Sequence, residues 1–134
     1  RLRPPGDPRR SMSGDRTATG RFWEEAASAY LERNGLTTLL KRYRCRLGEI
    51  DLVCAEGATL VIVEVRARRG GALVRASESV DARKRRRIVS AARHLLMSRP
   101  AWRERPVRFD VVAIDGIDAD EPEFNWIRAA FDAA

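Results

Sequence analysis

The sequence has few of the side chains from which proteins build soft-metal sites. Its 134 residues include two cysteines, Cys45 and Cys54, and a single histidine, His94. A structural zinc site takes about four such ligands, so a zinc cluster built from cysteine and histidine alone is excluded. Cys54 lies in an apolar stretch, which is typical of a small core residue, and we expect no disulfide in a chain of cytoplasmic character.

Long apolar runs are also missing. None approaches the roughly 18 residues of a membrane-spanning helix, and no apolar signal-peptide segment follows the basic start of the chain. We therefore expect a soluble, cytoplasmic protein. A length of 134 residues fits one domain and leaves little room for two.

Lysine is scarce, and arginine supplies nearly all of the positive charge. Lys41 and Lys84 are the two lysines among 26 basic residues, which face 19 acidic ones and give a formal charge of +7. This balance predicts attraction to a polyanion, with nucleic acid as the first candidate and an acidic membrane surface as the second. An arginine-rich coding habit would produce the same composition, so charge alone does not identify the partner.

The order of hydrophobic patterns predicts an α/β protein. Residues 1–19 are polar and contain three prolines, and we expect them to form a disordered basic tail ahead of a single domain at 20–134. Helical spacing begins at Gly20 and stops at Gly35, and a tight Glu56-Gly57 turn predicts a hairpin. The expected elements are a helix from 20, strands at 37–46, 49–55 and 59–67, a helix at 80–97, a strand at 107–115, and a strand or strand-to-helix segment at 124–131. The order αβββαβ plus a terminal element suggests a mixed sheet flanked by helices.

Three acids interrupt the central strands. In 59–67, Glu64 lies on the same face as Leu60, Ile62 and Arg66, whereas Val61, Val63 and Val65 point to the other face. In 49–55, strand alternation places Glu49, Asp51 and Val53 on one face and Ile50, Leu52 and Cys54 opposite. If the two strands pair around the Glu56-Gly57 turn, Asp51 comes roughly opposite Glu64 or its neighbour.

Two adjacent carboxylates repel, and partial burial increases the penalty. Such a pair persists if it shares a proton, pairs with cations, or binds a hard divalent metal such as Mg²⁺ or Mn²⁺. The alternative is structural: Asp51 and Glu64 would pair with Arg66 and with Arg44 or Arg46 at a solvated strand end. Spacing alone leaves both interpretations open.

Six segments follow one another along the chain: WEEAASAYL from Trp23, the GEIDLV that follows Arg44, LVIVEVRAR, SVDARK before a helix, RFDVV and WIRAAF. Together they resemble the YraN family, small bacterial proteins of the restriction-endonuclease-like fold. The resemblance covers most of the chain from about Gly20 onward. Their order and spacing are far more specific than any single segment.

The resemblance implies the nuclease motif written PD-(D/E)-x-K, in a fold related to archaeal Holliday junction resolvases. In that scheme Asp51 and Glu64 are metal ligands, and the backbone carbonyl of Val65 completes the inner sphere. Glu24 on the first helix corresponds to an additional acid of such nucleases, although Trp23 stands where the family usually has glycine. Its neighbour Glu25 points about 100° away around the helix and is expected on the surface.

Arg66 occupies the position of the catalytic lysine. Arginine keeps its proton in proteins, so it cannot act as a base, but it can hold the scissile phosphate and stabilise developing charge. Lys84 interrupts an apolar helical stripe that also contains Val80, Ile88 and Leu95. Either its ammonium snorkels to water, or it reaches the acids and supplies the charge that residue 66 no longer provides.

Basic residues cluster around the acidic strands in the sequence, and they predict contacts with phosphates that carry no base code. The candidate nucleic-acid-binding residues are Arg44, Arg46, Arg66, Arg68, Arg69, Arg83 and Arg87.

The remaining polar and aromatic residues have structural interpretations. Asp110 is expected to pair with Arg108 or with a neighbouring strand, and His94 is expected to face solvent. No run of interleaved aromatic residues and cations resembles a single-strand track. The tryptophans are therefore expected to pack in the fold: Trp23, Trp102 and Trp126.

These observations lead to one functional hypothesis and two alternatives. The hypothesis is a Mg²⁺- or Mn²⁺-dependent endonuclease with Asp51, Glu64, Arg66 and Lys84 as catalytic residues, acting on DNA, with branched or damaged structures as the substrates. The alternatives are a non-catalytic nucleic-acid-binding module that inherited the fold, and a protein-interaction domain. The sequence leaves monomer and homodimer equally open.

Overall fold

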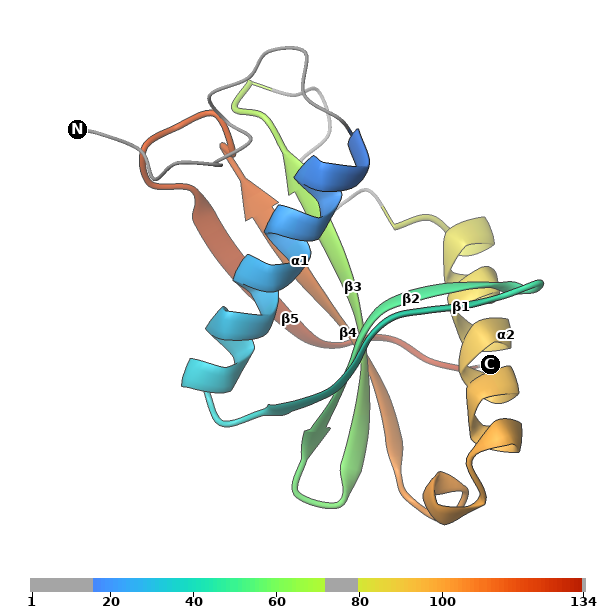
Figure 1. The fold of residues 1–134 in the computed structure, drawn as a ribbon. Coiled ribbons are helices and arrows are strands. Elements are labelled where there is room, and N and C mark those ends of the chain that lie inside the picture. Colours follow the sequence, from blue (N-terminus) through green and yellow to red (C-terminus); the bar gives the residue numbers. More distant parts are fainter. Residues whose placement is uncertain (1–15, 72–79, 134) are drawn as a thin grey trace.

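A computed structural model describes residues 16–71 and 80–133 (Figure 1). The elements follow the expected order, and the segment that sequence left ambiguous is a strand. They are α1 (Arg16–Arg33), β1 (Thr37–Cys45), β2 (Gly48–Glu56), β3 (Thr59–Arg68), α2 (Ala82–Ser98), the 3₁₀ helix η3 (Pro100–Trp102), β4 (Val107–Asp115) and β5 (Glu123–Phe131). The sequence analysis did not anticipate η3, which Pro100 opens.

The first helix starts earlier than expected. Helical spacing of apolar residues begins at Phe22, but α1 begins at Arg16, four residues before the predicted start at Gly20. Polar residues can extend a helix without burying a face, so an apolar pattern underestimates its length. Residues 1–15, the larger part of the predicted tail, lie outside the described residues.

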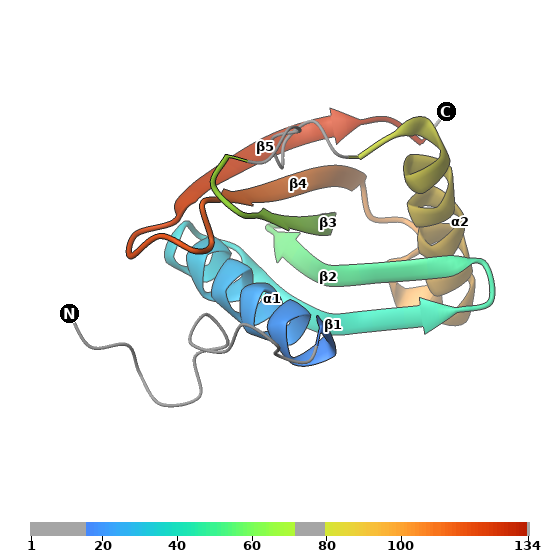
Figure 2. The same cartoon turned by 90° about the horizontal axis from the view of Figure 1, so that it is seen from above.

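The five strands form one mixed sheet in the order β1-β2-β3-β4-β5 (Figure 2). The β1–β2, β2–β3 and β4–β5 pairs are antiparallel, and the β3–β4 pair is parallel. Gly57, with φ of +60°, makes the tight turn of the predicted β2–β3 hairpin. The parallel pair needs a crossover connection, and α2 lies in it.

Each helix covers one face of the sheet, which gives two cores. Leu31 and Trp23 of α1 pack on Leu52, Val63 and Ile114, whereas the α2 core contains a separate set of side chains. The largest members of that set are Ile50, Ile62, Ile88, Leu95 and Phe109. The result is a mixed α/β fold consistent with a restriction-endonuclease-like core.

Strand alternation fails at one position of β2. Leu52 and Cys54 lie on one face of the sheet, as expected, and pack in the α1 core. Ile50 was predicted on that face, but it packs in the α2 core. Regular pairing of β2 with β3 extends from Glu56 and Thr59 to Leu52 and Val63. The departure from alternation therefore begins at Asp51, where the two strands cease to pair.

The β1–β2 hairpin crosses directly over α2 (Figure 1). A Cβ atom added to Gly48 would lie 2.6 Å from the backbone oxygen of Arg87 and 3.3 Å from its Cβ. Glycine is therefore required for this close approach of strand and helix backbones.

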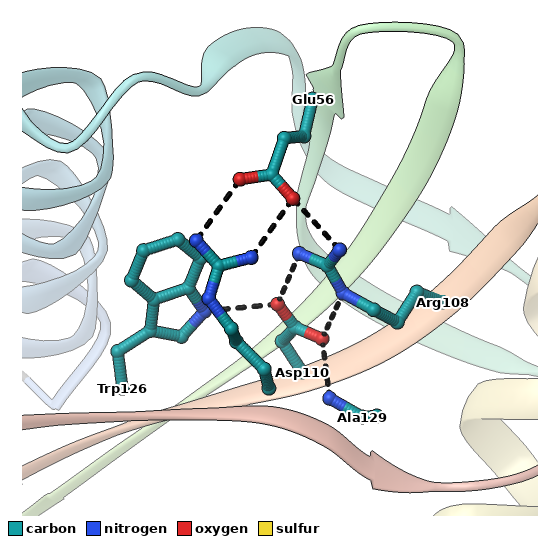
Figure 3. A network of polar contacts seen from close by, with 6 residues as sticks. Glu56, Arg108, Asp110, Trp126 and Ala129 are labelled. Carbon is teal, nitrogen blue, oxygen red and sulfur yellow. Dashed lines mark hydrogen bonds and ion pairs between the residues drawn. The ribbon is translucent and has the colours of Figure 1, made fainter.

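Asp110 is fully buried in the sheet and has a partner for each oxygen (Figure 3). Arg108 donates to both oxygens at 2.9 and 3.0 Å, which confirms the expected pairing. Trp126 Nε1 donates to Oδ2 at 2.8 Å, and the backbone N–H of Ala129, at φ of +49°, donates to Oδ1 at 2.9 Å. These contacts tie β5 to β4 where their register shifts.

Glu56 at the end of β2 extends the same network. It accepts from Arg108 at 2.8 Å and from Arg128 at 2.8 and 3.0 Å. Hydrogen bonds from Arg128 and Arg108 lower the pKa of Glu56 to about 2. The pair of Glu56 and Arg128 joins β2 to β5 across two intervening strands.

Substitution of the hairpin glycine tests its close approach to α2. Gly48→Ala should lower the free energy of unfolding by about 1–3 kcal/mol, because helix and strand must separate to admit a methyl group. Urea denaturation measures the change. Gly20→Ala is the control, since an added Cβ meets nothing within 4 Å at that helical position. Equal stability of Gly48→Ala and wild type would contradict the proposed contact.

The Glu56 network predicts a specific acid sensitivity. Because its folded pKa lies below the ordinary value of 4.5, the carboxylate stabilises the fold above about pH 4.5, and this contribution disappears as pH falls towards 2. Wild type should exceed Glu56→Gln in melting temperature at pH 6, and the gap should narrow between pH 4.5 and 2.5. Thermal melts of both proteins and of the exposed control Glu104→Gln measure it. A pH-independent gap would be inconsistent with this account.

Candidate active site

A pocket of about 520 Å³ opens between the start of α1 and the start of α2. It brings together residues that are far apart in the sequence, from both helices and from the two central strands. Its polar or charged lining residues are Thr19, Glu24, Glu49, Asp51, Glu64, Arg66, Arg68 and Lys84. All four predicted catalytic residues are among them.

Asp51 lies where β2 separates from β3. In place of another strand pair, the backbone N–H of Val65 donates to Asp51 Oδ2 at 2.8 Å. The Asp51 carboxyl is also hydrogen-bonded to that of Glu64. The predicted approach of Asp51 to Glu64 and its neighbour is therefore present.

The Asp51–Glu64 pair is held in a state that disfavours two negative charges. Burial raises the pKa of Asp51, and the hydrogen bond from Val65 opposes that rise. Burial, followed by repulsion from Asp51, raises the pKa of Glu64, whose side chain is 3% exposed. The negative charge of Asp51 therefore opposes ionisation of Glu64, and the buried pair disfavours two negative charges.

Glu24 of α1 is a further acid of the pocket, which Glu49 also lines. Burial and then repulsion from Asp51 raise the pKa of Glu24 to about 7. Its Oε1 atom is buried without a hydrogen bond, and lies 3.1 Å from Nε of Arg42. Glu25 is exposed and pairs with Lys41 at 2.8 Å, as expected of a surface residue.

Arg42 belongs to the basic residues that precede the acidic strand in the sequence, but its pairing with Glu24 was not predicted. Its backbone has φ of +61°, an uncommon conformation for a residue other than glycine. Its flanking residues pair as Lys41 with Leu52 and Tyr43 with Ile50, which places Arg42 beside Asp51 in the sheet. An irregularity between Thr38 and Leu40 sets this register, and no pattern in the sequence marks it.

Two cations approach the same oxygen of Glu64. Lys84 Nζ lies 3.4 Å and Arg66 Nη1 lies 3.5 Å from Glu64 Oε2. Lys84 therefore reaches the acids, as one of its two interpretations required. Asp81 fixes the start of α2 by accepting from the backbone N–H of Lys84 at 2.9 Å.

The structural alternative for the acids is present only in part. Glu64 does pair with Arg66, but Arg44 pairs with the exposed Glu49 at 3.0 Å. The buried Glu64 is not at a solvated strand end. A purely solvent-exposed ion-pair cluster is therefore excluded.

The oxygen donors suit a hard cation, but they do not form a closed cage. Among residues 16–71 and 80–133, no three His, Cys, Asp or Glu side chains are grouped as a metal site. Asp51 and Glu64 both line the pocket, and carboxylate oxygens are the type of donor that Mg²⁺ and Mn²⁺ prefer. The buried oxygen of Glu24 that lacks a hydrogen bond gives a further donor nearby.

The seven candidate nucleic-acid-binding residues divide into three groups. Arg66 and Arg68 line the site pocket, and Arg44 and Arg87 line a second pocket beside it. The others are exposed and line neither pocket: Arg46, Arg69 and Arg83.

The three tryptophans and the histidine each contact other side chains of the protein. Trp23 is buried in the α1 core, Trp102 lies under Arg99, and Trp126 donates to Asp110 beneath Arg128. The predicted packing roles are thereby confirmed. His94 is exposed, as expected, and its Nδ1 is hydrogen-bonded to the hydroxyl of Tyr43.

No helix in the described part of the chain combines the length and the apolar character needed to cross a membrane.

Comparison with known proteins places the chain among bacterial relatives of nearly the same length. A UPF0102 protein of Pseudomonas aeruginosa is 50% identical over 115 residues, covering 85% of this chain and 92% of the relative. One from Ectopseudomonas mendocina is 51% identical over 114 residues, covering 85% and 94%. One from Pseudomonas fluorescens is 43% identical over 126 residues, covering 91% and 99%.

The model of the uncharacterised protein family UPF0102 matches residues 23–114, a range that includes all four acids of the pocket. With this match and relatives at about 50% identity over most of the chain, the protein belongs to UPF0102, the YraN family.

Proposed function

We propose that this protein is a metal-dependent endonuclease that hydrolyses phosphodiester bonds in DNA. The observation that carries the proposal is the meeting of Glu24, Asp51 and Glu64, from three different elements, in one pocket that also contains Arg66 and Lys84. Perturbed acids beside specific cations in a concave site are typical of catalytic centres. The resemblance to restriction-endonuclease-like proteins gives the reaction class.

Asp51 and Glu64 would hold Mg²⁺ or Mn²⁺, with the carbonyl of Val65 as a further oxygen donor and Glu24 as a third or outer carboxylate. A bound ion would supply positive charge that offsets the acids and would promote ionisation of the attacking water. The hydrogen bond from Val65 fixes the Asp51 carboxylate in place for this task. Asp51 and Glu64 act through their ionised forms, so an ion that binds them must lower their raised pKa values and displace any bound proton.

Arg66 would bind the scissile phosphate and stabilise the charge that develops on it. Its guanidinium stays protonated, so it orients and stabilises without accepting a proton. Lys84 contributes a second positive charge near the same oxygen of Glu64. The two cations would stabilise the charge on the phosphate and on the departing 3′ oxygen, and the product would carry a 5′-phosphate.

A non-catalytic nucleic-acid-binding role is the second candidate, and Arg66 is the residue that favours it. A lysine at this position could be tuned by burial to assist the attacking water, which arginine cannot do. The same pocket would then bind a phosphate without cleaving it.

Cleavage of labelled DNA separates the two roles. With Mn²⁺, wild type should cut branched, flapped or linear DNA, whereas Asp51→Asn should retain less than about 1% of the rate, by analogy with loss of a key electrostatic group. Glu25→Gln, altered beside Glu24 but on the surface, is the matched control and should cleave as wild type does. Equal product from wild type and Asp51→Asn would eliminate the catalytic role.

Metal binding gives a second and independent test. Mn²⁺ at 100 times its dissociation constant should stabilise wild type by about 2.7 kcal/mol, and should not stabilise Asp51→Asn. In metal-free buffer, Asp51→Asn should be more stable than wild type by about 1 kcal/mol, since an active-site acid opposes folding. Thermal melts with and without Mn²⁺ measure both effects. An equal Mn²⁺ response in the two proteins would mean that Asp51 is not a ligand.

A further inference from the structure

A second pocket of about 390 Å³ adjoins the candidate site. Glu49 and Lys84 line both pockets, so the two form one continuous depression along the start of α2. The lining residues of the second pocket are Arg44, Cys45, Gly48, Glu49, Lys84, Arg87 and Ile88.

The charge of this pocket is positive, in contrast to that of the site beside it. Three cations, Arg44, Lys84 and Arg87, face one carboxylate, Glu49. Arg44 and Glu49 form an exposed ion pair at 3.0 Å, which contributes little to stability and can open without penalty. Within residues 16–71 and 80–133, Arg87 makes no ion pair or hydrogen bond from its side chain, so its charge is available to a ligand.

The second pocket forms where the β1–β2 hairpin contacts α2. Gly48 brings the start of β2 against the backbone of α2 at Arg87, at a distance that excludes any Cβ. This contact places the turn between β1 and β2 beside the basic first turns of α2. Arg44 then lies on the strand wall and Arg87 on the helix wall.

We propose that the second pocket binds a phosphodiester group of the substrate strand adjacent to the one that is cleaved. Arg87 and Arg44 are its contacts, and Lys84 lies between the two phosphates. The inference rests on the proposed function, because the strand is the same one whose scissile phosphate faces Asp51 and Glu64. A contact of this kind reads the backbone, and so positions the strand without selecting its sequence.

Neutral phosphates locate the contact directly. A set of DNA oligonucleotides carries one uncharged methylphosphonate at successive positions, and binding is measured by fluorescence anisotropy with Ca²⁺, a hard cation with the same oxygen preference. Wild type should lose affinity when the methylphosphonate lies next to the phosphate that faces Asp51 and Glu64. Arg87→Gln should bind unmodified DNA more weakly, lower the slope of log Kd against log salt by about 1, and lose its response at that position.

Arg86→Gln is the matched control. It removes the same charge from the same helix, but Arg86 is exposed, lines neither pocket and is not among the candidate nucleic-acid-binding residues. It should keep the wild-type response to each methylphosphonate. If Arg87→Gln also keeps that response, the second pocket is not a phosphate site, whereas the proposed function stands. If wild type fails to bind DNA, or binds it independently of salt, the proposed function itself is overturned.

Discussion

The hydrogen bond from the Val65 N–H to the Asp51 carboxylate is the contact on which the site depends. Regular pairing of β2 and β3 stops at Leu52 and Val63, and the next donor of β3 bonds to a side chain. An acid can be held inside the sheet at this point because a backbone donor satisfies it. The same contact brings Asp51 against Glu64, and lets Ile50 turn into the α2 core.

Two of the acids around this contact are paired with cations. Glu24 of α1 pairs with Arg42, and Glu64 pairs with Lys84 of α2. Arg42 adopts a strained backbone conformation beside its ion pair, and such strain is found where surrounding structure fixes a functional group. Three acids with raised pKa values make the pocket unfavourable for folding, which supports the proposal that a cation binds there.

The sequence predicted most of the fold and the identity of the central residues. Periodicity found both helices and four strands, and the Glu56-Gly57 turn fixed the hairpin that joins Asp51 to Glu64. The start of α1 and the alternation at Ile50 were not predictable, since polar helical turns and departures from strand pairing leave no periodic pattern. The pairing of Arg42 with Glu24 was missed for the same reason, because an irregularity in β1 sets the register of Arg42. The continuity of the two pockets depends on Gly48 meeting Arg87, a contact between segments 39 positions apart.

Our central proposal is that Asp51 and Glu64 share a divalent cation. Anomalous diffraction from crystals soaked in Mn²⁺ tests it most directly. The account predicts one anomalous peak in the pocket, with an oxygen of each carboxylate at about 2.1 Å, the distance typical of Mg²⁺. Ordered carboxylates that remain hydrogen-bonded to each other, with no peak between them at saturating Mn²⁺, would contradict it.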